Sequence, residues 1–350
     1  METSLEQLRI SHECTIADAL RKLNEIRDIS RLILFVEDQN KRIIGSLTDG
    51  DIRRSLAKDE NIYKSVLEVC NHNFVYKFNE EKFFDLKELK KNNILILPIL
   101  DKERKLQHII DLEKTKAVLP LECMIMAGGR GKRLSPLTDT IPKPMLPLGG
   151  KPIIEHNIDR LISFGIKKIY ISVKYLGEQI EDYFGDGSKK GIEIEYIWEE
   201  KALGTAGALS LVNKFETEHI LLINSDLFTN VDFEDLYLDM VRQQADMVVA
   251  STEYKVDVPY AVFETNEQQV VNFKEKPSYI YHSNAGIYMF KRELLKKIPR
   301  NEFYNITDLM DLIVKDGYKL IHNPIVGYWI DIGSPTDYKQ AQEFIKHARS

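Results

Sequence analysis

The sequence predicts a two-domain α/β protein in which a mixed, mostly parallel sheet follows a smaller α+β domain. Three observations lead to this expectation. The chain has 350 residues, and domains usually run to roughly 100–200 residues. From Cys123 onward, apolar strands alternate with amphipathic helices, which is typical of a parallel sheet covered by helices. Residues 1–119 instead contain a shorter pattern that occurs twice.

Composition and charge exclude several classes of protein. The 48 Lys and Arg residues against 54 Asp and Glu give a net charge of −6, which argues against a nucleic-acid coat or a polybasic membrane binder. The three cysteines lack metal-ligand spacing and cannot all pair. The N-terminus is polar, and no apolar run approaches the ~20 residues that span a bilayer. We therefore expect a cytoplasmic protein with no nucleic-acid or membrane partner.

The N-terminal region contains two similar halves. In the first half, Thr15 opens an amphipathic helix, strands over 32–36 and 43–47 flank a polar turn, and Thr48 begins a second helix. The second half repeats this order more weakly, with a helix over 80–91 and strands over 94–100 and 107–110. Two half-sized units that bury one shared face would explain both patterns.

The boundary between the domains is expected in the linker 114–121, which contains Pro120. Residues 1–119 then form one domain and residues 120–350 the other. The second domain is predicted to contain strands over 124–127, 169–173, 192–198 and 219–223, with helices over 152–165 and after Tyr175. Ligands of such sheets bind beyond the carboxyl ends of the strands, so the functional residues are expected there.

A glycine-rich loop follows the first strand of the second domain. Its glycines, which let backbone N–H groups approach phosphate oxygens, are Gly128, Gly129 and Gly131. A Walker A loop would need glycine in place of Met126 and Ser or Thr in place of Arg133. A dinucleotide fingerprint would need glycine in place of Leu134. Single residues therefore exclude both common phosphate-binding motifs.

The loop instead resembles the GGxGxRLxPLT signature of sugar nucleotidyltransferases, which is matched at residues 128–138. The match continues through residues 141–147. Five further blocks follow in the family's order: Leu203–Leu209, Asn224–Leu227, Glu275–Pro277, Asn284–Tyr288 and Trp329–Gly333. The resemblance implies a Rossmann-like GT-A domain that transfers a nucleotidyl group from a nucleoside triphosphate to a sugar 1-phosphate and releases pyrophosphate.

The resemblance also implies which residues carry the reaction. Asp226 and Asp331 would hold Mg²⁺, which prefers one or two carboxylates together with phosphates and water. Arg133 and Lys143 would contact the triphosphate. Because two polyanions must meet, catalysis should consist mainly of charge neutralisation and positioning. Taken singly, each aspartate could be an ordinary strand-end or capping residue, but their occurrence together with the loop favours the metal site.

Nucleotide and sugar contacts follow from the same resemblance. The nucleotide-binding residues would be Ala127, Gly128, Gly129, Gly131, Gly204 and Glu199. Glu199, or alternatively Glu200, could accept two hydrogen bonds from guanine, which favours GTP over UTP, dTTP or CTP. The sugar contacts would be Glu275, Asn284, Tyr260 and Ala261, with Lys276 as a catalytic residue that holds the sugar phosphate. The alternative for Glu275 and Lys276 is a solvated pair at the end of a strand.

The N-terminal halves resemble a tandem pair of CBS domains, and residues 45–51 carry the resemblance. It implies that Thr48 and Asp51 hold an adenine nucleotide. The alternative is that both residues only cap a helix. A CBS pair ahead of this catalytic domain particularly resembles glucosamine-1-phosphate guanylyltransferases of legionaminic acid biosynthesis. CBS pairs also imply a homo-oligomer. A different class of function would be an inactive nucleotide-sugar sensor that acts through a partner.

Overall fold

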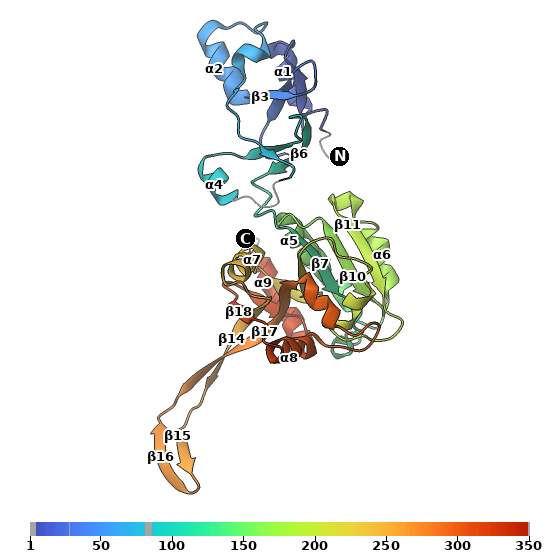
Figure 1. The fold of residues 1–350 in the computed structure, drawn as a ribbon, viewed down its shortest axis with the longest axis vertical. Coiled ribbons are helices and arrows are strands. Elements are labelled where there is room, and N and C mark those ends of the chain that lie inside the picture. Colours follow the sequence, from blue (N-terminus) through green and yellow to red (C-terminus); the bar gives the residue numbers. More distant parts are fainter. Residues whose placement is uncertain (1–4, 28, 81–85, 349–350) are drawn as a thin grey trace. The chain divides into compact units, whose positions relative to one another are not determined.

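The computed structural model describes residues 5–27, 29–80 and 86–348. The chain divides into two compact units, residues 1–119 and residues 120–350. Each unit has its own apolar core: one cluster centres on Leu34 and Phe35, and another on Leu222 and Phe290. The two units are therefore described separately (Figure 1).

The N-terminal unit is built from two halves of the same topology. The first half contains β1 (Arg9–Ser11), α1 (Ile16–Glu25), β2 (Ile33–Glu37), β3 (Ile43–Thr48), α2 (Asp49–Asp59) and α3 (Val66–Val69). The second contains β4 (Lys77–Phe78), α4 (Leu86–Lys91), β5 (Ile96–Leu100) and β6 (Leu106–Asp111). In each half the first strand pairs parallel with the second, and the second pairs antiparallel with the third.

This repetition confirms the predicted α+β pair. Of the predicted helix over 80–91, the structure contains α4 (Leu86–Lys91). Residues 81–85 lie outside the described residues. Helices α1 and α2 begin with capping boxes at Thr15 and Thr48, in which the threonine and the third helical residue satisfy each other's backbone N–H groups.

The C-terminal unit contains one large sheet in the order β11-β10-β7-β12-β17-β14-β18. Its strands are β7 (Leu121–Met126), β10 (Lys168–Val173), β11 (Glu193–Trp198), β12 (His219–Asn224), β14 (Met247–Asp257), β17 (Ser278–Lys291) and β18 (Leu320–Pro324). The first four strands in the sheet order are parallel, whereas β17 is antiparallel to both of its neighbours. The mixed, mostly parallel sheet confirms the predicted fold class.

Helices and short elements connect these strands. The α-helices are α5 (Ile153–Ser163), α6 (Gly177–Phe184), α7 (Phe233–Arg242), α8 (Ile306–Lys315) and α9 (Pro335–Ala348), and the 3-10 helices include η1 (Lys132–Leu134), η2 (Lys143–Met145), η4 (Gly207–Leu211) and η5 (Arg292–Lys297). β7 and β12 are central neighbours that end together, with Asn224 opposite Met126. The loops that follow these two strands therefore start side by side.

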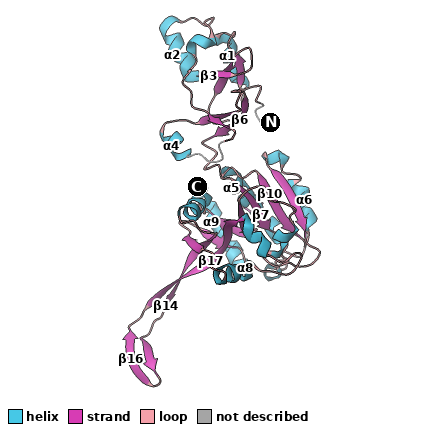
Figure 2. Cartoon of the chain, in the orientation of Figure 1, coloured by secondary structure: helices cyan, strands magenta, loops and turns pink. Residues whose placement is uncertain are grey.

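Two features of this unit were not predicted. β13 (Leu227–Thr229) pairs antiparallel with β19 (Trp329–Asp331) to form a small separate sheet. β14 and β17 continue beyond the sheet as a two-stranded ribbon that ends in β15 (Val262–Asn266) and β16 (Gln269–Lys274), as Figures 1 and 2 show. Among the described residues, no helix is long and apolar enough to cross a membrane.

Candidate active site

Asp226 and Asp331 are brought together by the small β13–β19 sheet. Asp226 lies in the turn between β12 and β13, and Asp331 ends β19 opposite Leu227. The backbone N–H of Ile332 donates to the carbonyl oxygen of Asp226 at 3.0 Å. The N–H of Ser225 donates to the carbonyl oxygen of Met126 at 3.2 Å, which ties this turn to the end of β7. Two residues 105 positions apart in the chain thus become neighbours at the carboxyl edge of the sheet.

The two carboxylates have the character of a cation site. The Oδ1 atoms of Asp226 and Asp331 are buried without a hydrogen-bond partner. Burial first, and the charge of Asp226 second, raise the pKa of Asp331, while Lys143 and Arg133 act in the opposite direction. Buried acceptors without donors are costly, and a divalent cation would satisfy both. The pair therefore fits Mg²⁺.

Lys143 provides the positive charge next to these carboxylates. It lies in η2 between Pro142 and Pro144, it is only 9% exposed, and its Nζ donates to Oδ2 of Asp226. Its side chain packs against Gly131, which has a φ of 65°, so that a Cβ added at Gly131 would lie 3.0 Å from Cβ of Lys143. The glycine in the loop thus permits a close approach between two segments of the site.

Arg133 and the glycine loop complete a cavity of about 280 Å³ above the carboxylates. The cavity is lined by Met126, Gly129, Gly131, Lys132, Arg133, Lys143, Pro144, Ser225, Asp226 and Gly333. Arg133 itself is exposed, and its guanidinium packs over Gly333, where an added Cβ would lie 3.3 Å from Nη2. Three cationic side chains and Asp226 therefore face one space, an arrangement suited to a metal-bound polyphosphate.

Glu199 lies next to the glycine loop, but its oxygens are already used within the protein. It is 8% exposed and accepts hydrogen bonds from the hydroxyl of Ser172 and from the N–H of Leu203, the latter at 2.9 Å. A Cβ added at Gly128 would lie 2.8 Å from its Oε1. Glu199 therefore links the loop, β10 and the turn at Leu203, which is a positioning role that the sequence did not suggest.

The remaining residues that were predicted to bind the nucleotide lie around the same edge of the sheet. The N–H of Ala127 donates to the carbonyl oxygen of Ser172 at 2.9 Å, and Gly129 is open to solvent with space around it. Gly204 has a φ of 74°, and an added Cβ would lie 2.7 Å from the carbonyl oxygen of Tyr304. Close packing on the segment at Tyr304 thus explains this glycine without a ligand.

The structure does not bring four of the predicted sugar-site residues to this cluster. Tyr260, Ala261, Glu275 and Lys276 lie beyond the last rung of the β14–β17 ladder, Asp257 opposite Ser278. Six residues separate that rung from Ser251 opposite Asn284, which is roughly 20 Å at about 3.3 Å per residue. A short motif does not encode the direction of the ribbon that carries it. In this structure the four residues lie away from the carboxylates, and their role as sugar contacts stays a prediction.

Asn284, in contrast, lies at the edge of the sheet. Its Oδ1 accepts a hydrogen bond from the N–H of Gly286 at 2.9 Å, and the next residue, Ile287, pairs with Ile223 of β12. The indole N–H of Trp329 donates to the adjacent carbonyl oxygen of Ala285 at 2.8 Å. Asn284 therefore lies next to β19, the strand that ends at Asp331.

In the N-terminal unit, Thr48 and Asp51 form the helix cap that the sequence suggested as one alternative, and they also line a cavity. Their side chains form the capping box of α2, with the Thr48 hydroxyl donating to Asp51 at 2.6 Å. They also line a cavity of about 230 Å³ together with Arg31, Ser46 and residues of the second half, including Ile96. Capping therefore explains the pair, while the cavity leaves room for a ligand between the two halves.

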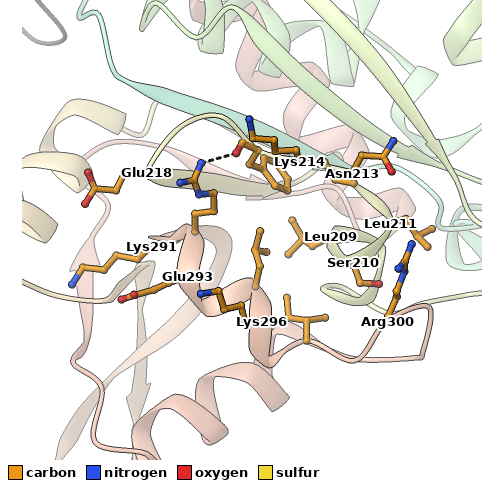
Figure 3. Close-up of a pocket in the computed structure, with 15 residues that line it drawn as sticks. Leu209, Ser210, Leu211, Asn213, Lys214, Glu218, Lys291, Glu293, Lys296 and Arg300 are labelled. Atoms are coloured by element: carbon orange, nitrogen blue, oxygen red, sulfur yellow. Dashed lines mark hydrogen bonds between the residues drawn. The ribbon is translucent and has the colours of Figure 1, made fainter.

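A larger cavity of about 810 Å³ lies at the opposite end of the C-terminal unit's sheet. Glu218, just before β12, and Lys291, at the end of β17, are among its lining residues. Figure 3 shows Lys214, Lys296 and Arg300 around it. This cavity has no buried carboxylate pair and is separated from Asp226 by the length of β12, so we do not assign the chemistry to it.

Sequence reasoning missed two residues that shape the site. Ser172 is fully buried and holds Glu199, and Gly333 supports Arg133. A polar residue near the carboxyl end of the otherwise apolar segment 169–173 was an available signal for Ser172. Gly333 had none, because its role depends on a contact with a side chain 200 residues earlier.

Comparison with known proteins agrees with this geometry. The family model described as nucleotidyl transferase matches residues 122–348, and the CBS domain model matches residues 7–58. The chain belongs to the nucleotidyl transferase family. The match covers nearly the whole C-terminal unit of this nucleotidyl transferase. In the N-terminal unit the CBS match covers the first half, and the second half is related to it by topology.

Three similar proteins illustrate the range of the family. The D-glycero-alpha-D-manno-heptose 1-phosphate guanylyltransferase of Aneurinibacillus thermoaerophilus is 32% identical over 65% of this chain and 99% of its own. The UTP–glucose-1-phosphate uridylyltransferase of Synechocystis is 31% identical over 63% of this chain and 62% of its own. HddC from Yersinia pseudotuberculosis, solved in complex with GMP-PN, has a TM-score of 0.51 and 25% identity over 64% of this chain and 99% of its own. The chain spans about three fifths of the length of the first curated relatives.

Proposed function

We propose that this nucleotidyl transferase moves a nucleotidyl group from a nucleoside triphosphate, preferentially GTP, to a sugar 1-phosphate, and releases pyrophosphate. One observation carries the proposal. Asp226 and Asp331 each have a buried carboxylate oxygen without a hydrogen-bond partner, and Asp226 lines a cavity together with the cations Lys132, Arg133 and Lys143. Such a set suits a metal-bound triphosphate, because three cations face the space where the phosphate oxygens would lie.

The chain's own residues would neutralise and position the two anions. Lys143 and Arg133 would balance the charge on the triphosphate and on the departing pyrophosphate. The fixed backbone at Pro142 and Pro144 limits the conformational entropy that Lys143 loses on binding phosphate. Mg²⁺ held by Asp226 and Asp331 would supply charge stabilisation at the phosphates. Among the described residues, no three His, Cys, Asp or Glu side chains gather as a metal site, so phosphates and water would provide the other ligands.

The preference for GTP rests on the relatives and on Glu199. The heptose 1-phosphate relative is a guanylyltransferase, whereas the Synechocystis relative uses UTP. Glu199 accepts two internal hydrogen bonds, and a carboxylate retains further lone pairs for a base. Selection of the base would therefore depend on the loop that Glu199 holds as much as on its own oxygens.

A substrate matrix tests the proposal. Each of the four nucleoside triphosphates is paired with hexose, hexosamine and heptose 1-phosphates in the presence of Mg²⁺, and pyrophosphate release is measured. We expect release with GTP and at least one sugar 1-phosphate, and loss of release on chelation of the metal. Release with UTP alone would overturn the base preference, and the absence of release in every pair would overturn the enzyme in favour of a nucleotide-sugar sensor.

For the N-terminal unit we propose binding of an adenine nucleotide at the cavity lined by Thr48, Asp51 and Arg31. Asp51 would contact ribose hydroxyls, and Arg31 would contact a phosphate. Calorimetric titration of the full chain with AMP and ATP measures this binding. We expect Arg31→Ala to weaken it at least tenfold without changing the fold, whereas heat-silent titrations of the native chain would remove the proposal.

A further inference from the structure

The cavity of about 810 Å³ in the C-terminal unit has no part in the proposed function. Its walls come from η4 (Gly207–Leu211), from the loop that leads on to β12, and from η5 (Arg292–Lys297). Cavities that bind small molecules usually measure about 300–1,000 Å³. This cavity therefore has the size of a ligand site.

The cavity is separate from the candidate active site. Glu218 lies at the start of β12 and lines the cavity, whereas Asp226 follows the other end of that strand. The six residues of β12 give five steps of about 3.3 Å, or roughly 17 Å. A polyphosphate held near Asp226 does not extend that far, so a molecule in this cavity would be a second ligand.

The charge around the cavity is positive, although the chain as a whole carries −6. Two acids, Glu218 and Glu293, line it together with five cations, which gives a local charge of +3. The cations are Lys214, Lys291, Arg292, Lys296 and Arg300. A concave site of one sign concentrates small ions of the other sign, so the lining favours an anion.

Two of these cations are available to a ligand. Lys296 and Arg300 are exposed, and in the described part of the chain neither side chain has an ion pair or a hydrogen bond. Lys214 pairs with Glu216 at 3.0 Å, but these side chains are 70% and 65% exposed, so the pair contributes little. Figure 3 shows Glu218 and Glu293 beside Lys291 at one end of the cavity and Arg300 at the other.

The other two cations hold the walls in place. Lys291 donates to Asp246 at 2.6 Å. Arg292 donates to the carbonyl oxygens of Phe215 and Glu216, at 2.7 and 3.1 Å. On the opposite wall, the hydroxyl oxygen of Ser210 accepts from the N–H of Asn301 at 3.0 Å. The cavity is thus formed before a ligand enters, which lowers the ordering cost of binding.

The lining combines these charges with apolar side chains. Leu209, Phe215 and Ile298 line the cavity and are themselves buried. An apolar surface with a few charged groups suits a molecule that has an uncharged body and an anionic group. Arg and Lys together bind phosphate oxygens well, and Glu218 and Glu293 can accept hydrogen bonds from hydroxyl groups. Phosphate esters of hydroxyl-bearing molecules carry all of these features.

We propose that this cavity binds a small phosphorylated molecule, with its phosphate at Lys296 and Arg300 and its uncharged part against Leu209 and Phe215. Sugar phosphates and nucleotides share this chemistry, and the test below distinguishes them. The site uses none of the residues assigned to the transfer reaction, so the proposal stands independently of the proposed function.

A cysteine reporter in the full chain localises binding to this cavity. Asn213 is exposed and lines the cavity. Asn213→Cys is placed in a Cys14→Ser background, whose remaining cysteines are buried, and its alkylation by iodoacetamide is timed at constant ionic strength. The probes are inorganic pyrophosphate, glucose 1-phosphate and GDP, with glucose and guanosine as uncharged counterparts. At a probe concentration about ten times the dissociation constant, mass action leaves roughly one site in ten free. We therefore expect at least one phosphorylated probe to slow alkylation about tenfold, whereas the uncharged counterparts leave the rate unchanged.

Charge variants in the reporter background complete the test. Lys296→Ala with Arg300→Ala should abolish the protection. The matched control, Lys189→Ala with Arg242→Ala, removes two exposed cations that do not line the cavity and should retain it. Melting temperatures without ligand check that both variants remain folded. The proposal is overturned if no phosphorylated probe protects at millimolar concentration, or if the uncharged counterparts protect equally. Protection that survives in Lys296→Ala with Arg300→Ala would place the binding elsewhere, and equal loss in the control would reduce the effect to general charge.

Discussion

At the scale of single residues, the site is defined by two like charges held close together in partial burial. Asp226 and Asp331 repel each other, and burial disfavours the ionised form of Asp331. Lys143 relieves only part of this cost, since it bonds to Oδ2 of Asp226 and leaves both Oδ1 atoms without a partner. A protein keeps such a costly arrangement where a bound cation removes the cost.

Asp226→Asn is expected to lower turnover by at least about a hundredfold, the range typical for removal of one group that stabilises developing charge. The amide cannot supply the anionic ligand that a divalent cation requires. Pyrophosphate release at saturating GTP and sugar 1-phosphate measures the effect. Asp182→Asn, an exposed carboxylate on α6, serves as the control and should retain native turnover. Native turnover in Asp226→Asn would contradict the assignment.

Asp331→Asn is expected to raise the melting temperature of the metal-free protein at neutral pH by a few degrees, an effect limited by solvent screening. The pKa of Asp331 is raised in the folded state, so its ionised form costs stability at every pH above that folded value. The native protein regains this stability as the pH falls through the folded pKa and Asp331 becomes protonated. The advantage of the variant should therefore shrink on acidification. A variant that melts below the native protein at neutral pH would refute this account.

At the scale of elements, short irregular segments position the site more than the regular strands do. η1 follows Gly131, which has a positive φ, and η2 holds Lys143 between prolines. The carbonyl oxygen of Gly131 accepts a hydrogen bond from the buried Thr138 hydroxyl at 2.9 Å. The loop is thus a defined structure before any ligand binds, which reduces the ordering cost of phosphate binding.

Gly131→Ala is expected to destabilise the C-terminal unit by roughly 1–2 kcal/mol, because an L-residue in the left-handed region is strained and its Cβ would press on Lys143. Denaturant unfolding monitored by fluorescence measures the loss. Gly129→Ala is the matched control in the same loop, since its Cβ would meet no atom within 4 Å. Equal stability of the two variants would show that the left-handed turn does not matter.

At the scale of the whole molecule, each unit has a core of its own. The clusters around Leu34 and around Leu222 have no residue in common, and the chain divides between Leu119 and Pro120. Such an arrangement allows each unit to unfold as a separate cooperative transition. Changes in stability should therefore be confined to the unit that carries the substitution.

Calorimetric unfolding is expected to show two transitions, and one substitution in each unit identifies them. Thr48→Ala removes the capping box of α2 and should lower only the first unit's transition, by about 1 kcal/mol. Glu122→Gln places an amide where Glu122 accepts from the N–H groups of Glu216 and Thr217, and it should lower only the other transition. A single transition moved by both substitutions would show that the units unfold together.

The sequence by itself determined the elements and the family. Periodicity predicted the strands of the parallel sheet, and the resemblance of short blocks to family motifs pointed to the glycine loop, Asp226 and Asp331. These signals are local, because a strand or a turn depends on residues within a few positions of each other. The sequence could not indicate that β13 pairs with β19, that Ser172 and Leu203 occupy Glu199, or that Gly333 supports Arg133.

Only the tertiary structure decided those contacts, since each joins segments that are distant in the chain. It also decided the position of Lys276. The motif that contains this lysine lies on the ribbon, and the continuous β14–β17 rungs carry it away from the carboxylates. Register between strands is set by long-range packing, so a motif can be recognised by its residues while its place relative to the site depends on the fold.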